Sequence, residues 1–249
     1  MKLRELTLKQ RLAFGLDVPA AEVEEKLSIF GPLVGWVKVN RAFLNGGWKL
    51  MNSIAAKGAN TFLDLKWKDI PETVRGYVEE AITSAKLGMF NVHASGGYEM
   101  MALSRKYLGE KFKDNSDERP LMIAVTMLTT QTNDDLEAMG IKNITIAEMS
   151  VNLALMAKSA GCDGVVAAAE DAAIIRNAVG EDFLIVTPAI RFIDGSVKND
   201  DQKRLSAPDV AIQNGSDILV MARPLLQGGT DAVMKAYDLI EKGLKNRGY

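Results

Sequence analysis

Residues 62–71 read FLDLKWKDIP, an apolar run that changes to alternating charges and stops at a proline. Side chains alternate between the two faces of a β-strand, so Asp64 and Lys66 are predicted to project from the same face near the strand's carboxyl end. Asp69 follows just past this strand, and the proline suits the first turn of a helix. Spacing alone leaves two interpretations, a solvated strand end or an inward ion pair, because charged residues are seldom buried unless they are paired.

The composition indicates one soluble domain. The chain has 249 residues, of which 47% are hydrophobic and 25% charged, which is enough for one sizeable core. Its net charge of −2 offers no basic field for nucleic acid. Cys162 is the only cysteine, which excludes a disulfide within the chain. The first residues are charged where a secretory signal is apolar, and no stretch approaches the roughly 18 apolar residues of a membrane span. We therefore expect a cytoplasmic protein that binds neither nucleic acid nor membranes.

Eight short apolar segments alternate with helical patterns along the chain. The predicted strands are residues 12–17, 36–40, 62–68, 89–93, 121–126, 164–168, 183–188 and 218–221. The predicted helices are residues 20–30, 47–57, 71–87, 98–112, 146–160, 171–179 and 230–244, with a short helix from Pro208. Eight such units predict an α/β fold, a (β/α)₈ TIM barrel that forms a single domain over residues 1–249. An open doubly wound sheet is the alternative, but no Gly-x-Gly-x-x-Gly follows the first strand.

Polar side chains follow several of the predicted strands. In a barrel the carboxyl ends of the strands meet on one face, where barrel enzymes keep their sites. The residues predicted at this face are Asp17, Lys38, Asp64, Lys66, Thr129, Arg191 and Arg223. Lys38 is expected beside Asp64, which would build an alternating network of Lys38, Asp64, Lys66 and Asp69.

A phosphate site is predicted after strands seven and eight, the connections that barrels commonly use for it. Arg223 follows the eighth strand, and Gln202 lies near the end of the charged loop over residues 189–206 that follows the seventh. The guanidinium of Arg223 offers a planar fork to phosphate oxygens, and backbone N–H groups near Ala222 can add to it. A surface ion pair of Arg223 is the alternative interpretation.

The run from Asp64 to Thr73 resembles the Asp-x-Lys-x-x-Asp signature of the orotidine 5′-phosphate decarboxylase family, in its longer form Asp-Leu-Lys-x-x-Asp-Ile-Pro-x-Thr. Further matching segments are Leu16-Asp17, Val37-Lys38-Val39 and residues 91–97, 124–129, 187–191, 201–204 and 222–224. The resemblance implies a homodimeric enzyme that decarboxylates orotidine 5′-phosphate to UMP, the last step of de novo pyrimidine nucleotide biosynthesis. The chemistry fits these residues without a metal or other cofactor.

The resemblance also implies a role for each matching side chain. The implied catalytic residues are Lys66, Asp64, Asp69 and Lys38. The implied substrate-binding residues are Asp17 and Lys38 at the ribose, Thr129 near the pyrimidine, Thr73, Arg191 from the loop, and Gln202, Ala222 and Arg223 at the phosphate. Lys66 is expected to protonate C6 as the general acid, with Asp64 orienting it. Asp69 and Thr73 are implied to reach across a twofold interface, so that each site contains residues of both chains.

Three positions depart from the family's pattern. Ala189 and Ala222 stand where the family usually has glycine, and Lys68 stands where it often has histidine. Each alanine adds a methyl group beside the ligand and resists positive φ, which predicts tighter or slower closure of the phosphate loop.

His93 is the only histidine, which excludes a multi-histidine metal site. We interpret it as a structural residue or a neighbour of the site.

Two other functions fit parts of the pattern. Magnesium-dependent sugar-phosphate decarboxylases and hexulose-phosphate synthases of the same superfamily also resemble the Asp-x-Lys-x-x-Asp signature. They place a metal-binding glutamate near the position of Lys38, and a cation there would repel Mg²⁺. A catalytically silent barrel that binds sugar phosphates is the alternative from another class. Such a role does not require Lys66 between two aspartates.

Overall fold

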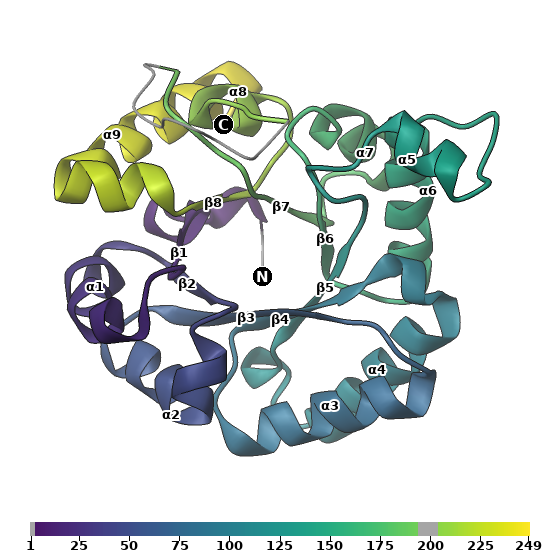
Figure 1. Ribbon diagram of the computed structural model, residues 1–249, viewed down its shortest axis with the longest axis horizontal. Coiled ribbons are helices and arrows are strands. Elements are labelled where there is room, and N and C mark those ends of the chain that lie inside the picture. The colour runs from purple at the N-terminus through teal and green to yellow at the C-terminus, as the bar shows by residue number, and fades with distance from the viewer. Residues whose placement is uncertain (1–2, 194–203) are drawn as a thin grey trace.

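The computed structural model describes residues 3–193 and 204–249. Its parallel strands pair in chain order, and the first also pairs with the last, so the sheet closes into a barrel with helices around it (Figure 1). The strands are β1 Leu12–Gly15, β2 Trp36–Val39, β3 Asn60–Trp67, β4 Met89–His93, β5 Leu121–Val125, β6 Gly164–Val166, β7 Leu184–Thr187 and β8 Ile218–Met221. The predicted (β/α)₈ barrel is therefore confirmed.

The helices of the described residues follow the predicted order, with differences at their ends. They are α1 Val23–Phe30, α2 Phe43–Ala56, α3 Pro71–Ser84, α4 Tyr98–Lys111, α5 Asn133–Ala138, α6 Ile146–Ser159, α7 Ala172–Val179, α8 Pro208–Gln213 and α9 Arg223–Arg247. Helices α2 and α9 begin earlier than predicted, because each has a short first segment that bends at a glycine of positive φ. These glycines are Gly47 (φ +51°) and Gly229 (φ +61°). The sequence pattern detected only the segment after each bend.

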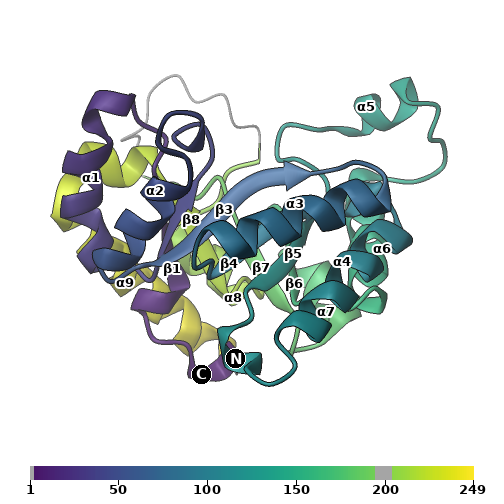
Figure 2. The ribbon, with the colours of Figure 1, turned by 90° about the horizontal axis from the view of Figure 1, so that it is seen from below.

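Helix α5 was not predicted, because its sequence is polar and lacks an apolar stripe. It is held at its start by a capping box, in which Thr132 and Asp135 exchange side-chain and backbone hydrogen bonds. Figure 2 shows α5 projecting from the barrel at the end opposite the C-terminus.

Alternating strand residues divide the core into two layers. The inner cluster includes Ala13, Phe62 and Met89 from successive parts of the barrel, and it fills the barrel's interior. The outer cluster includes Leu63 and Phe90, the next residues of the same strands, which pack against the helices. Asp64 follows Phe62 by two residues and so lies on the same inner face, toward the mouth of the barrel.

No helix within residues 3–193 and 204–249 combines the length and the apolar character needed to cross a membrane.

Candidate active site

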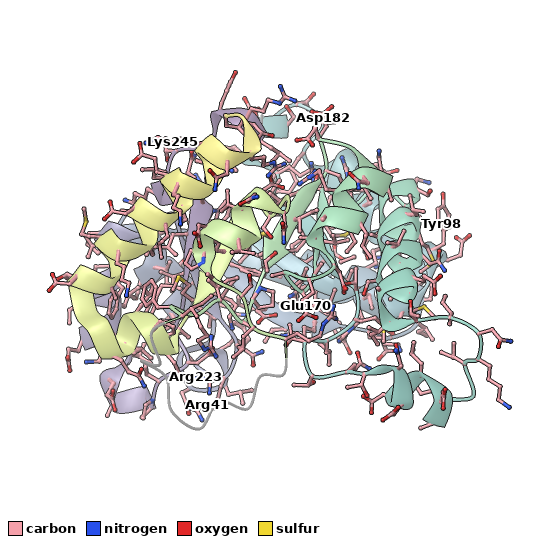
Figure 3. All side chains as sticks on the ribbon, turned by 90° about the horizontal axis from the view of Figure 1, so that it is seen from above. Arg41, Tyr98, Glu170, Asp182, Arg223 and Lys245 are labelled. Carbon is pink, nitrogen blue, oxygen red and sulfur yellow. The ribbon has the colours of Figure 1, made fainter. Side chains whose placement is uncertain are left out.

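A cavity of about 640 Å³ lies at the carboxyl ends of the strands. Phe62 and Val220 of the inner cluster line it, and so form its floor. Eight of the residues predicted from sequence also line it: Asp17, Lys38, Asp64, Lys66, Thr129, Arg191, Ala222 and Arg223. Figure 3 shows Arg223 at the same end of the molecule as Glu170, with Lys245 and Asp182 at the opposite end. These eight predicted residues therefore lie together at the carboxyl ends of the strands.

The buried carboxylate of Asp64 joins two lysines in this cavity. Its Oδ1 atom lies 2.6 Å from the Nζ of Lys66, and its Oδ2 atom lies 3.0 Å from the Nζ of Lys38. Lys38 also contacts the Oδ2 of Asp17 at 3.4 Å. The side chain of Asp64 is only 8% exposed, so these contacts lie largely away from water, where electrostatic interactions are stronger. The predicted contact between Lys38 and Asp64 is present.

The ion pairs keep the charged forms of Asp64 and Lys38 in place. Burial alone raises the pKa of Asp64, but the charges of Lys38 and Lys66 outweigh it and hold this pKa below its ordinary value. Burial alone lowers the pKa of Lys38, but Asp64 and Asp17 outweigh it and raise this pKa above its ordinary value. Near neutral pH both groups are therefore ionised.

Strand β3 is irregular where it carries Asp64 and Lys66, which simple alternation did not predict. Its pairing with β4 shifts register between Leu63 and Trp67, and Lys66 has a left-handed backbone with φ +52°. A β-bulge of this kind re-aims side chains next to a site. Asp64 and Lys66 do share a face as predicted, but the bulge contributes to their approach.

Two asparagines missed by the sequence analysis hold this bulge. Asn91 of β4 accepts a hydrogen bond from the backbone N–H of Lys66 at 2.8 Å and donates one to the Oδ1 of Asp64 at 2.6 Å. Asn40, just after β2, donates to the backbone carbonyl of Asp64 at 2.9 Å. The available signal was position, since Asn91 follows Met89 by two residues and so shares its inward face.

The predicted phosphate end of the cavity is formed by residues after β7 and β8. Arg223 is the first residue of α9, and Ala222 precedes it as the N-cap. Ala189 has φ +62°, the left-handed conformation that an alanine resists. The backbone N–H of Arg191 donates to the carbonyl of Ser206 at 2.9 Å, which joins the two sides of the long connection. Gln202 lies outside the described residues.

Arg204 ties the chain after this connection to the end of β6. Its guanidinium donates to the Oε2 of Glu170 at 2.8 Å and also to Asp171, which in turn accepts from Ser150 at 2.9 Å. Arg204 and Asp171 are buried. This cluster was not among the predicted site residues. Its ion pairs and hydrogen bonds hold the chain after the long connection against the residues that follow β6.

Asp69 and Thr73 do not line the cavity of their own chain. Asp69 is exposed, and its Oδ1 accepts a hydrogen bond from the backbone N–H of Ile70 at 2.7 Å. Within one chain, the contacts therefore join Lys38, Asp64 and Lys66 but not Asp69.

His93 lies half-buried at the end of β4. Burial lowers the pKa of its imidazole, and the nearby charges of Lys66 and Lys68 lower it further. His, Cys, Asp and Glu side chains nowhere gather in threes that could hold a metal ion within the part of the chain that the structure describes.

Comparisons with known proteins show the family of this chain. The model of the orotidine 5′-phosphate decarboxylase / HUMPS family matches residues 10–237. Two relatives called orotidine 5′-phosphate decarboxylase, from Geotalea uraniireducens and Geotalea daltonii, are 42% and 41% identical over 221 residues. The aligned part is 87% of this chain and 88% and 89% of those relatives. The crystal structure of orotidine 5′-phosphate decarboxylase from Lactobacillus acidophilus superposes with a TM-score of 0.76 at 28% identity, covering 97% of this chain and 100% of that one. The chain therefore belongs to the orotidine 5′-phosphate decarboxylase / HUMPS family.

Proposed function

We propose that this protein decarboxylates orotidine 5′-phosphate to UMP without a metal or other cofactor, as the last step of de novo pyrimidine nucleotide biosynthesis. One observation carries the proposal, the ammonium of Lys66 paired at 2.6 Å with the buried carboxylate of Asp64 inside the cavity. The names of the relatives point to the same reaction.

The proposed reaction has two steps at C6 of the pyrimidine. The bond from C6 to the carboxylate breaks, carbon dioxide leaves, and the electron pair stays on C6. The Nζ of Lys66 then donates a proton to C6, and the neutral amine regains a proton from water. The fixed charges of Lys66 and Lys38 favour the developing negative charge electrostatically, and they need no reorganisation during the reaction. Asp64 orients the ammonium through its 2.6 Å contact.

The remaining cavity residues provide a binding site of matching polarity. We assign Asp17 and Lys38 to the ribose hydroxyls and Thr129 to the edge of the pyrimidine. These three residues line the cavity that Lys66 enters.

The phosphate is assigned to the residues after β7 and β8. Arg223 and the backbone of Ala222 lie together at the start of α9, which suits an anion, and Arg191 lines the cavity beside them. We also assign Gln202 to the phosphate, from the sequence alone.

We further propose that the active unit is a homodimer in which Asp69 and Thr73 complete the partner's site. Asp69 is exposed and lies off its own cavity. Large apolar side chains are exposed in the same part of the chain, since Ile70 is 67% exposed and Tyr77 of α3 is 42% exposed. Exposed apolar side chains that form a contiguous patch are typical of an interface. One domain over residues 1–249 and a cytoplasmic location stay predictions from the sequence.

The proposal is tested by following the conversion of orotidine 5′-phosphate to UMP, with and without a chelator. We expect the wild type to be active in both conditions and Lys66→Ala to be inactive while it still binds UMP. Activity that required Mg²⁺ would favour the magnesium-dependent relatives, and a wild type that only bound nucleotide would favour a silent barrel. Undiminished turnover by Lys66→Ala would overturn the mechanism.

A further inference from the structure

The β3–β4 ladder has a gap at the point where β3 carries its charged residues. Leu63 pairs with Phe90, and the next pair is Trp67 with Val92. Residues 64–66 of β3 therefore stand opposite one residue of β4, Asn91. A bulge of this kind leaves backbone groups without their ladder partners, and these need other hydrogen bonds when they lie in the interior.

The side chain of Asn91 supplies the missing hydrogen bonds. Its Oδ1 accepts the backbone N–H of Lys66 at 2.8 Å, at the residue with φ +52°. Its Nδ2 donates at 2.6 Å to the Oδ1 of Asp64, the same oxygen that the Nζ of Lys66 contacts at 2.6 Å. A backbone N–H can only donate and a carboxylate can only accept, so the two contacts also fix which end of the amide is the oxygen.

Asn91 thus joins the backbone of one charged residue to the side chain of the other. It is 1% exposed and does not belong to the residues that line the cavity. Its contacts set both the left-handed turn that directs Lys66 and the rotation of the Asp64 carboxylate. An amide is suited to this place because it donates and accepts at once without adding charge.

We propose that Asn91 is a positioning residue that holds the ammonium of Lys66 and the carboxylate of Asp64 in their reactive arrangement. The inference rests on the proposed function for its kinetic consequence, because the positioned group is the proton donor to C6. Its geometric part, the hydrogen bond to the backbone of Lys66, holds whatever the reaction is.

The test compares Asn91→Ala with a matched control in the same pair of strands. Thr61 of β3 is also buried, and its hydroxyl donates to the carbonyl of Lys86 at 3.2 Å and accepts from Gly88 at 2.9 Å. Thr61→Val therefore removes two hydrogen bonds between β3 and the chain entering β4, at the end away from the cavity. We expect Asn91→Ala to lower kcat about a hundredfold, the size of effect that a misplaced reacting group produces, while KM stays within about threefold. Thr61→Val should lower the melting temperature and leave kcat nearly unchanged.

A second variant keeps the shape of the side chain and replaces its amide with a carboxyl group that can lose a proton. Asn91→Asp places a carboxylate against that of Asp64, and only its protonated form can donate as the amide does. The charged groups around this position are Lys38 from β2, Asp64 and Lys66 from β3, and His93 on the same strand. The kcat of Asn91→Asp should therefore rise as the pH falls, relative to the wild type, whose profile already includes His93. This comparison also serves if Asn91→Ala fails to fold.

Hydrogen exchange separates a failure of this inference from a failure of the proposed function. The amide of Lys66 should be protected in the wild type and in Thr61→Val, and it should exchange faster in Asn91→Asp at neutral pH, whether or not the protein decarboxylates anything. An inactive wild type would remove the proposed function and leave this readout intact. The positioning role is overturned if Asn91→Ala and Thr61→Val lower kcat equally, or if the kcat of Asn91→Asp follows the wild-type pH profile. It is also overturned if the amide of Lys66 exchanges at the same rate in Asn91→Asp as in the wild type.

Discussion

Mixed dimers provide the sharpest test of the shared site, and their activity can be worked out in advance. Lys66 lines the cavity of its own chain, whereas Asp69 is exposed and accepts a hydrogen bond from the N–H of Ile70 beside it. In a dimer of one Lys66→Ala chain and one Asp69→Ala chain, one site lacks both groups and the other keeps both. Random pairing of equal amounts makes about half of the dimers mixed, and each has one intact site of two. We therefore expect about a quarter of wild-type activity from two variants that are each inactive alone.

The assay is decarboxylation after the two variants are unfolded and refolded together, with subunit exchange confirmed by mass on differently tagged chains. A matched control pairs Lys66→Ala with Asp64→Asn, whose side chains contact each other within one chain at 2.6 Å. Neither site of that mixed dimer is complete, so its activity should stay at background. If exchange is complete and the Lys66→Ala and Asp69→Ala mixture also stays at background, Asp69 serves its own chain and the shared site is wrong.

Three further predictions concern the phosphate end and the ion pairs. Arg223→Ala should lower kcat/KM for orotidine 5′-phosphate about tenfold to a hundredfold, because a hydrogen bond to a charged group contributes about 1.5 to 3 kcal/mol. Orotidine lacks the phosphate, so wild type and Arg223→Ala should have the same kcat/KM for it. An equal loss of kcat/KM for orotidine and for orotidine 5′-phosphate would place the phosphate elsewhere. Ala189→Gly should raise the free energy of unfolding in urea by up to about 1 kcal/mol, since glycine relieves the strain of φ +62° but loses more entropy on folding. A decrease in the free energy of unfolding by more than about 1 kcal/mol would contradict the strain expected at Ala189. The pKa of Asp64 is lowered in the folded state, so its contribution to stability is lost as the pH falls below about 4. The pKa of Lys38 is raised in the folded state, so its contribution to stability is lost as the pH rises above about 10. The difference in unfolding free energy between wild type and the double variant Asp64→Asn/Lys38→Gln should therefore be flat between about pH 5 and 9, and a slope near neutral pH would count against this pairing.

The fold could be predicted from the sequence because each strand is a short apolar run with a helix after it. The elements that escaped were those without such a pattern. The first segments of α2 and α9 lie before Gly47 and Gly229, where the bend interrupts the helical spacing. Helix α5 is polar and depends on its capping box more than on a buried face. Periodicity reports burial, and these segments are set by local backbone and capping interactions instead.

The charged members of the site were predictable for a different reason. Asp17 and Arg223 follow apolar runs, Lys38 lies near the end of β2, and the barrel brings the strand ends together at one cavity. Asn91 was not predictable in the same way, because an amide within a strand has many possible uses. Its role depends on the register shift between Leu63 and Trp67, which no spacing in the sequence reveals.

The bulge explains why this site needs an uncharged polar partner as well as its ion pairs. A left-handed backbone at a residue such as Lys66 costs about 1 to 2 kcal/mol. The hydrogen bond from its N–H to Asn91 offsets about 0.5 to 1.5 kcal/mol, and the bond from Asn91 to the charged Asp64 contributes about 1.5 to 3 kcal/mol. The two bonds together are thus large enough to hold the strained turn, while either alone is comparable with its cost. Ion pairing alone does not set this backbone, because Lys66 has a flexible side chain that could reach Asp64 from several conformations. The amide of Asn91 removes that freedom, and the ammonium then stays aimed at one place in the cavity.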